Sequence, residues 1–153
     1  MYLNNADFTR HILDYRSCLI SRNRYRLLSE PRVAPAGVDY TAQKVASEIA
    51  FQKAESLLVS DLYLLADNIL KIGFVSVADR EDAKQHAVMI CLTKLDRYRE
   101  SKGKAFNFFT AVILNSCKQV MRQSKAFESL RVREFDRLYS GGHYRNGHKA
   151  FDE

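Results

Sequence analysis

The sequence predicts an all-α protein folded as a compact helical bundle. Its 153 residues, 46% of them apolar and 27% charged, are enough for one domain with a buried core. Two prolines and six glycines provide few turns, whereas a strand-rich chain needs many. Apolar residues recur every three or four positions along most of the chain, which is the period of an amphipathic helix.

The first half of the chain is expected to hold two helical segments separated by a loop. Residues 6–28 carry apolar side chains on one helical face, and a long helical pattern returns over 40–72. Both prolines fall within 30–37, which is predicted to be a loop because proline stops a helix. The pattern over 40–72 is compatible with one helix or with two stacked segments.

The second half is expected to hold three more helices, over about 79–98, 105–125 and 126–139. Acidic residues at the start of the first of these suit the positive end of a helix dipole. The short sequence RESKG forms the predicted turn before the next helix. Residues 140–153 are polar and rich in glycine, so they are predicted to be a flexible tail beyond a single domain at 1–139.

The positive charge of the chain is concentrated in one part of the sequence. The net charge is +6 overall, but the window from Arg97 to Arg133 alone holds nine basic and two acidic residues, a net of +7. A local excess of this kind favours a polyanionic partner such as nucleic acid.

Several other classes of protein find no support in the sequence. There is no apolar run of 18 residues and no secretion-signal layout, so no membrane partner is expected. The three cysteines lack metal-ligand spacing and indicate reduced thiols in a cytoplasmic protein. No HExxH, GxSxG or phosphate-binding glycine loop occurs, and no acidic pair is suited to acid–base catalysis. The chain is therefore expected not to be an enzyme and to need no metal or cofactor.

Three phenylalanines lie within the basic window and permit two interpretations. Helical phase places Phe106 and Phe109 on the face that carries Ile113, which is typical of core, while Phe108 lies elsewhere. An exposed ring beside Lys102 and its basic neighbours would instead suit the stacking of single-stranded bases. Residue pattern alone leaves core and stacking equally supported.

The order of features over residues 81–123 resembles conserved region 2 of bacterial sigma factors. Within that family it is similar to the compact late-gene sigma factors of large tailed bacteriophages, and the likeness covers about residues 8–125. The matching pieces, aligned without a gap, are Asp82-Ala-Lys-Gln85-His86-Ala87, Leu95-Asp96-Arg97-Tyr98, Lys102-Gly103-Lys104 and Phe106-Asn107-Phe108-Phe109-Thr110. The resemblance implies a fold like sigma factor domain 2.

The resemblance also implies two partners. The helix that begins near Asp82 would bind the clamp helices of core RNA polymerase, although His86 and Ala87 depart from the Glu-Gly of the family. The polymerase-facing residues would be Asp82, Gln85, His86, Val88 and Leu92. The aromatic helix would bind promoter DNA and capture a base flipped from the non-template strand of a −10-type element, with Phe109 as the stacking residue.

The implied DNA-binding set mixes rings, aliphatic wedges and cations. Val112 and Ile113 stand where primary sigma factors have two tryptophans, and the basic residues would track phosphates, which gives affinity rather than sequence choice. The full set is Lys102, Lys104, Phe108, Phe109, Val112, Ile113, Ser116, Lys118, Gln119 and Arg122.

A third implied partner is a replication sliding clamp or another coactivator. The phage subfamily uses a short hydrophobic and acidic motif for this contact, and Phe135, Leu138 and Tyr139 resemble it. Packing of an amphipathic helix is the alternative explanation of these residues.

The sequence therefore predicts a non-catalytic sigma-like factor that recognises and melts a late promoter in the cytoplasm, which is that of a host cell if the chain is viral. Two alternatives remain open. One is a helical polymerase-binding adaptor without promoter specificity, and the other is a generic basic DNA-binding domain.

Overall fold

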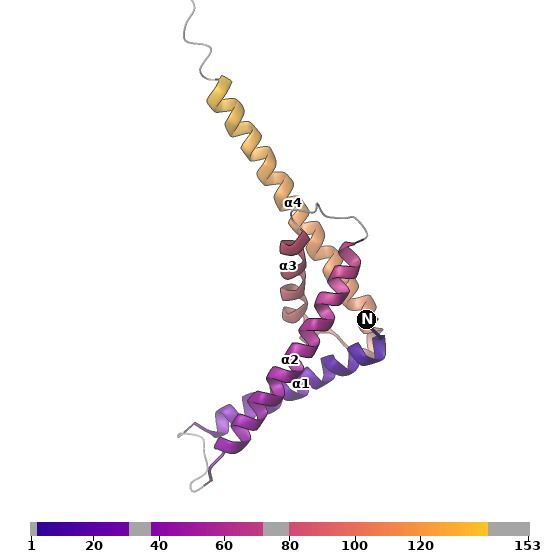
Figure 1. Cartoon of the computed structure of the whole chain (residues 1–153), viewed down its shortest axis with the longest axis vertical. Coiled ribbons are helices and arrows are strands. Elements are labelled where there is room, and N and C mark those ends of the chain that lie inside the picture. The colour runs from indigo at the N-terminus through magenta and orange to yellow at the C-terminus, as the bar shows by residue number, and fades with distance from the viewer. Residues whose placement is uncertain (1–2, 31–37, 72–79, 141–153) are drawn as a thin grey trace, which may run out of the picture. The chain divides into compact units, whose positions relative to one another are not determined.

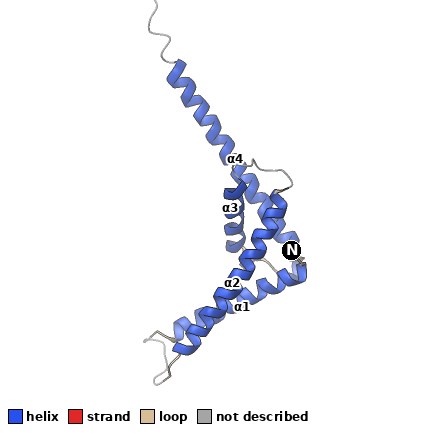
Figure 2. Cartoon of the chain, viewed as in Figure 1, coloured by secondary structure: helices blue, strands red, loops and turns tan. Residues whose placement is uncertain are grey.

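The computed structural model describes residues 3–30, 38–71 and 80–140, with side chains up to residue 138 (Figure 1). All regular structure in these ranges is helical, which confirms the all-α prediction (Figure 2). The chain divides into two compact units, Met1–Cys117 and Lys118–Glu153. The elements are α1 (Asn5–Leu28), α2 (Thr41–Leu70), α3 (Arg80–Thr93), the 3-10 turns η1 (Leu95–Arg97) and η2 (Glu100–Lys102), and α4 (Ala105–Ser140).

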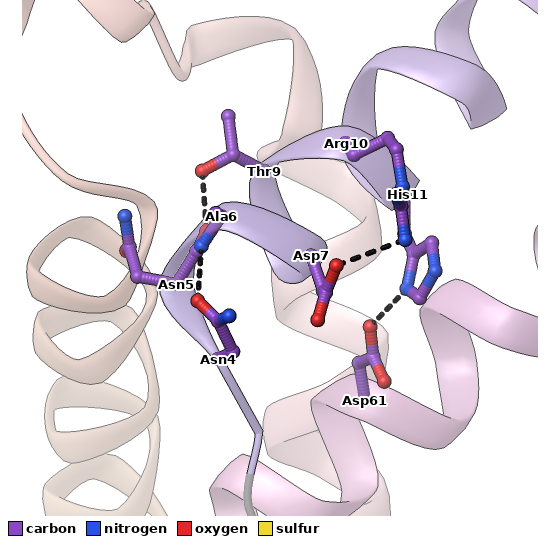
Figure 3. A network of polar contacts seen from close by, with 8 residues as sticks. All are labelled: Asn4, Asn5, Ala6, Asp7, Thr9, Arg10, His11 and Asp61. Carbon is purple, nitrogen blue, oxygen red and sulfur yellow. Dashed lines mark hydrogen bonds and ion pairs between the residues drawn. The ribbon is translucent and has the colours of Figure 1, made fainter.

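Helix α1 begins at a side-chain cap and is joined to α2 by a polar contact (Figure 3). The Oδ1 atom of Asn4 accepts a hydrogen bond of 2.8 Å from the backbone N–H of Ala6, which satisfies one of the free donors at the helix start. Farther along, Nδ1 of His11 lies 2.5 Å from a carboxylate oxygen of Asp61 on α2. Both side chains are largely buried, so this pair fixes the register of the two helices.

Helices α1 and α2 pack side by side and run antiparallel. The ring of Tyr15 lies 5.3 Å from that of Phe51, and the guanidinium of Arg22 lies 3.7 Å from the same Phe51 ring. Helix α2 is one uninterrupted helix of 30 residues, which answers the question left open by its sequence pattern. Its buried positions are Ser47, Phe51, Ala54, Leu58, Leu62, Ala66, Ile69 and Leu70.

The second half of the chain departs from the prediction at two places. The helix expected over 79–98 ends at Thr93, and the 3-10 turn η1 replaces its last part. The helices expected over 105–125 and 126–139 are one continuous helix, α4, because no proline or glycine interrupts residues 105–140. Apart from residues 30 and 140, the predicted loop at 30–37 and the predicted tail at 140–153 lie outside the described residues.

The core of the first unit draws buried apolar side chains from all four helices, and an aromatic cluster joins α1 to the start of α4. The ring of Phe8 on α1 lies 5.4 Å from that of Phe109 and 5.6 Å from that of Phe106. Asn5 accepts a hydrogen bond of 3.1 Å from the backbone N–H of Phe106, so the first turn of α4 is capped from α1. Among the described helices, none is both long enough and apolar enough to cross a membrane.

Candidate nucleic-acid interface

The turn between α3 and α4, here called the elbow (residues 94–104), is held from α1. The guanidinium of Arg16 donates hydrogen bonds to the backbone carbonyls of Leu95 and Tyr98, the latter at 2.9 Å. The side chains of Leu95 and Tyr98 are buried. The elbow therefore has a fixed backbone, although its outer side chains face solvent.

Gly103 ends the elbow in a conformation that suits glycine. Its φ of 140° lies in the left-handed half of conformational space, where a side chain is strained even though nothing lies within 4 Å of a Cβ at this position. Its carbonyl accepts a hydrogen bond of 3.3 Å from the hydroxyl of Tyr98. This geometry turns the chain into α4. The residues on either side of the glycine in the sequence are lysines.

A cavity of about 340 Å³ opens on this turn and is here called the elbow cavity. Two aromatic rings, those of Tyr98 and Phe108, contribute to its lining and lie 5.6 Å apart. Tyr98 is buried, whereas Phe108 is partly exposed. The complete lining is Arg97, Tyr98, Arg99, Lys102, Gly103, Lys104, Asn107 and Phe108.

The elbow cavity combines a partly exposed ring with a cluster of cations. Its four basic residues are all exposed, and no acidic residue lines it. A base can stack on the ring of Phe108 while the neighbouring cations attract the phosphates on either side. Sequence reasoning identified Lys102, Lys104 and Phe108 for this role.

Besides Tyr98 and Gly103, three residues of the cavity were not predicted as DNA-binding residues. Arg97 and Arg99 flank the buried Tyr98, and Asn107 lies next to Phe108. Both arginines had been counted in the local positive charge, and Arg97 also belonged to a matched piece of the sigma-like pattern, but neither had been assigned to DNA. Their alternation with Tyr98 was the available signal, since an extended residue with a buried ring turns its neighbours toward solvent.

The assignment of Phe109 as the stacking residue requires correction. Its side chain is 0% exposed and packs against the rings of Phe8, Tyr98 and Phe108, the last at 4.9 Å with the ring planes nearly perpendicular. No face of this ring is open to a base in this structure. Of the two adjacent rings, that of Phe108 is the partly exposed one.

Three further predicted DNA contacts are buried in the first unit. Val112, Ile113 and Ser116 are 8%, 0% and 4% exposed. The two apolar side chains follow Phe109 at helical spacing and continue the core face of α4, so neither forms an exposed wedge. Helical phase had indicated this for Ile113, and the structure extends it to Val112.

The remaining predicted DNA contacts belong to the second unit. Lys118, Gln119 and Arg122 are exposed on α4, and Lys118 and Arg122 are four residues apart and therefore share a helix face. This basic face is available to phosphates. Phe135 and Leu138 in the same unit are 60% and 73% exposed, and the side chain of Tyr139 lies outside the described residues.

Helix α3 presents a row of side chains on one face, here called the α3 stripe (Asp82, Gln85, Met89 and Leu92), of which the first three are exposed and Leu92 is partly exposed. These positions recur at helical spacing, and Met89 is 55% exposed. Asp82, Gln85 and Leu92 were predicted to face a polymerase, whereas Met89 was missed. Val88 was also predicted to face a polymerase, but it is 3% exposed and belongs to the core, so this prediction requires correction.

Helix α3 is also tied to α2 by an ion pair between Lys84 and Asp67, and each partner has a second, local ion pair. The ammonium of Lys84 lies 2.7 Å from Glu81 and 3.6 Å from Asp67 on α2, and Lys71 lies 2.7 Å from Asp67. The hydrogen bond from Lys71, together with the charge of Lys84, lowers the pKa of Asp67, and the hydrogen bond to Glu81 raises the pKa of Lys84. This network fixes one flank of α3 and leaves the α3 stripe outward.

Comparison with known proteins adds no further assignment. No family model, curated protein or solved structure matches the chain. Within the described ranges, no group of three histidine, cysteine, aspartate or glutamate residues is placed to hold a metal ion.

Proposed function

We propose that this protein is a sigma-like promoter-specificity factor that binds core RNA polymerase and opens an AT-rich −10-type late promoter element. The observation that carries the proposal is the elbow cavity, in which the partly exposed ring of Phe108 adjoins four exposed basic side chains. Single-stranded nucleic acid needs this combination of a flat stacking partner and cations.

The order of surfaces along the chain supports the same proposal. In the sigma-like pattern, a polymerase-binding helix precedes a basic turn and an aromatic DNA-binding helix. Here the exposed α3 stripe precedes the elbow, and the elbow leads into the aromatic start of α4. In this proposal the α3 stripe contacts the polymerase clamp helices, and the basic face of Lys118 and Arg122 contacts duplex phosphates.

In this proposal the roles of the two adjacent phenylalanines differ from the sequence prediction. Phe108 stacks on the flipped base, while Phe109 supports the ring of Phe108 from behind through their perpendicular contact. Arg97, Lys102 and Lys104 attract the strand through its phosphates, which makes its affinity fall as salt rises.

Run-off transcription tests the proposal. Purified bacterial core polymerase is combined with this protein and with templates that carry a −10-type element alone, with and without a sliding clamp. Initiation at a defined start is the expected result. Phe108→Ala is expected to lower opening by about 5- to 150-fold, which corresponds to the loss of one stacked base, while binding to core polymerase persists. Phe127→Ala is the matched control on an exposed ring in the second unit.

The two alternatives give different outcomes in the same assay. An adaptor without promoter specificity binds core polymerase but directs no start, and the exposed α3 stripe is the observation that favours it. A generic basic DNA-binding domain binds duplex DNA with no preference for a single-stranded AT-rich segment and does not bind the polymerase. Either outcome would contradict the proposed function.

A further inference from the structure

Two residues that the sequence assigned to different partners contact each other in the structure. His86 on α3 was predicted to face the polymerase, and Ser116 on α4 was predicted to touch DNA. The Nδ1 atom of His86 lies 2.8 Å from the hydroxyl oxygen of Ser116. Ser116 is 4% exposed, so its hydroxyl is withdrawn from any DNA surface and its partner is this imidazole.

This hydrogen bond closes a hairpin of which the elbow is the turn. His86 lies in the middle of α3, Ser116 lies 30 residues later in α4, and the whole elbow falls between them. Helix α3, the elbow and the part of α4 that ends at Cys117 belong to the first unit. The bond therefore restrains the two helices that lead into and out of the elbow cavity.

The position of His86 on α3 explains how this restraint works. Lys84 and His86 are two residues apart, so their side chains point to nearly opposite flanks of the helix. Lys84 binds Asp67 of α2 on one flank, and His86 binds Ser116 of α4 on the other. The helix is thus held from both flanks, and the α3 stripe between them remains outward.

The chemistry of the pair makes it a fixed link. A serine hydroxyl can donate to a neutral Nδ1 or accept from an Nδ1–H, so the contact is possible in either tautomer and after protonation. Alanine at either position leaves the other polar group without its partner, and Ser116 is too buried to find water instead.

We propose that His86 is a positioning residue that, through Ser116, couples the polymerase-binding α3 stripe to the DNA-binding elbow cavity, and that it makes no contact with polymerase. The inference rests on the proposed function, because it concerns the two surfaces named there. It assigns His86 and Ser116 one shared role in place of two separate ones.

A double-mutant cycle tests the proposal with His86→Ala, Ser116→Ala and the double variant. We expect each single variant to lower open-complex formation about 5- to 10-fold, and the double variant to lose no more than either single one. Affinity for core polymerase is expected to stay within about twofold of the parent protein. Gln85→Ala in the α3 stripe is the matched control and is expected to lower that affinity about fivefold or more.

Two further measurements separate positioning from general destabilisation. His86→Asn retains a hydrogen-bonding atom near the place of Nδ1 and is expected to restore most of the opening activity. Thermal unfolding of every variant shows whether it is folded at the assay temperature. The proposal is overturned if the variants lose opening activity only in proportion to their unfolded fraction. It is also overturned if His86→Ala weakens binding to core polymerase while Ser116→Ala binds and opens like the parent protein.

If the parent protein starts no transcription, the proposed function is overturned. The coupling between His86 and Ser116 is then tested without polymerase. The probe is then a fluorescent single-stranded AT-rich oligonucleotide. The same non-additive loss of binding is expected for the three alanine variants. Equal binding by all of them overturns the role of the pair at the elbow cavity.

Discussion

Helix α4 contains two parts that are both helical but differ in how far their side chains are buried. The part in the first unit, Ala105–Cys117, buries one side chain or more in every turn, including Phe109 and Ile113. In the part from Lys118 onward, every side chain from Arg122 to Leu138 is exposed, including Phe127 and Leu130. Both parts are apolar at helical spacing, so apolar periodicity makes a helix without deciding whether the helix is buried.

The difference also separates two uses of aromatic residues. Phe109 contributes to stability through its ring contacts with Phe8, Tyr98 and Phe108. Phe127, which is 64% exposed, makes no comparable contribution to the core of the first unit. Phe108 lies between these extremes, because it is supported by Phe109 and Tyr98 on one side and lines the elbow cavity on the other.

The largest expected effect is a difference in the rate of thiol labelling between the buried part of α4 and its exposed part. Cys117 is 2% exposed, and burial raises its pKa, so the native protein holds very little reactive thiolate at this position at neutral pH. A cysteine introduced as Ser124→Cys lies on the exposed part. We expect it to react with a disulfide reagent at least about 1,000-fold faster than Cys117, which must wait for local or global opening.

The buried Cys91 serves as the internal control of this labelling experiment. Burial raises the pKa of its thiol to about 12, so it too should be protected in the native protein and react only after unfolding in urea. Rapid native labelling of Cys117 would show that the first part of α4 is not packed as described.

The second prediction concerns Phe109→Ala, which removes a fully buried ring. We expect a loss of about 3–5 kcal/mol in the free energy of unfolding, because the transfer of the ring and the remaining cavity both destabilise the fold. Urea unfolding followed by circular dichroism measures this loss. Phe127→Ala is the matched control and is expected to change the free energy by less than about 0.5 kcal/mol. Similar losses in the two variants would erase the contrast between the two parts.

The third prediction concerns Phe108→Ala at the boundary between core and cavity. We expect a loss of about 1–3 kcal/mol in the free energy of binding to single-stranded DNA, which is the usual contribution of one stacked base. Fluorescence anisotropy at two salt concentrations measures it. The salt dependence should be unchanged, because the cations of the cavity remain. Unaltered affinity would mean that this ring does not stack on a base.

The smallest expected effect is that of Ala126→Gly in the exposed part of α4. Glycine costs about 1 kcal/mol relative to alanine in an exposed helix, and residues around it make no core contacts that would spread the effect. Helical ellipticity should fall, while the urea midpoint of the first unit, followed by labelling of Cys91, should not move. A shifted midpoint would indicate that the second unit helps to stabilise the first.

The sequence predicted the helical class and most helix positions, because periodicity and the rarity of proline and glycine act locally. It placed α1 within one residue of its observed start and identified the basic turn with its lysines beside Gly103. It predicted two helices where α4 is one, since a run without breakers offers no sign of where the tertiary support ends.

What only the tertiary structure decided is which side chain occupies which surface. Phe108 and Phe109 are adjacent and equally apolar. Both rings contact Tyr98, but Phe109 also packs against Phe8 and is fully buried, whereas Phe108 lines the cavity. Sequence periodicity likewise could not predict the hydrogen bond between His86 and Ser116, because these residues are 30 positions apart. Local spacing fixes helices and their apolar faces, whereas the packing of distant segments determines which polar and aromatic groups remain accessible to a partner.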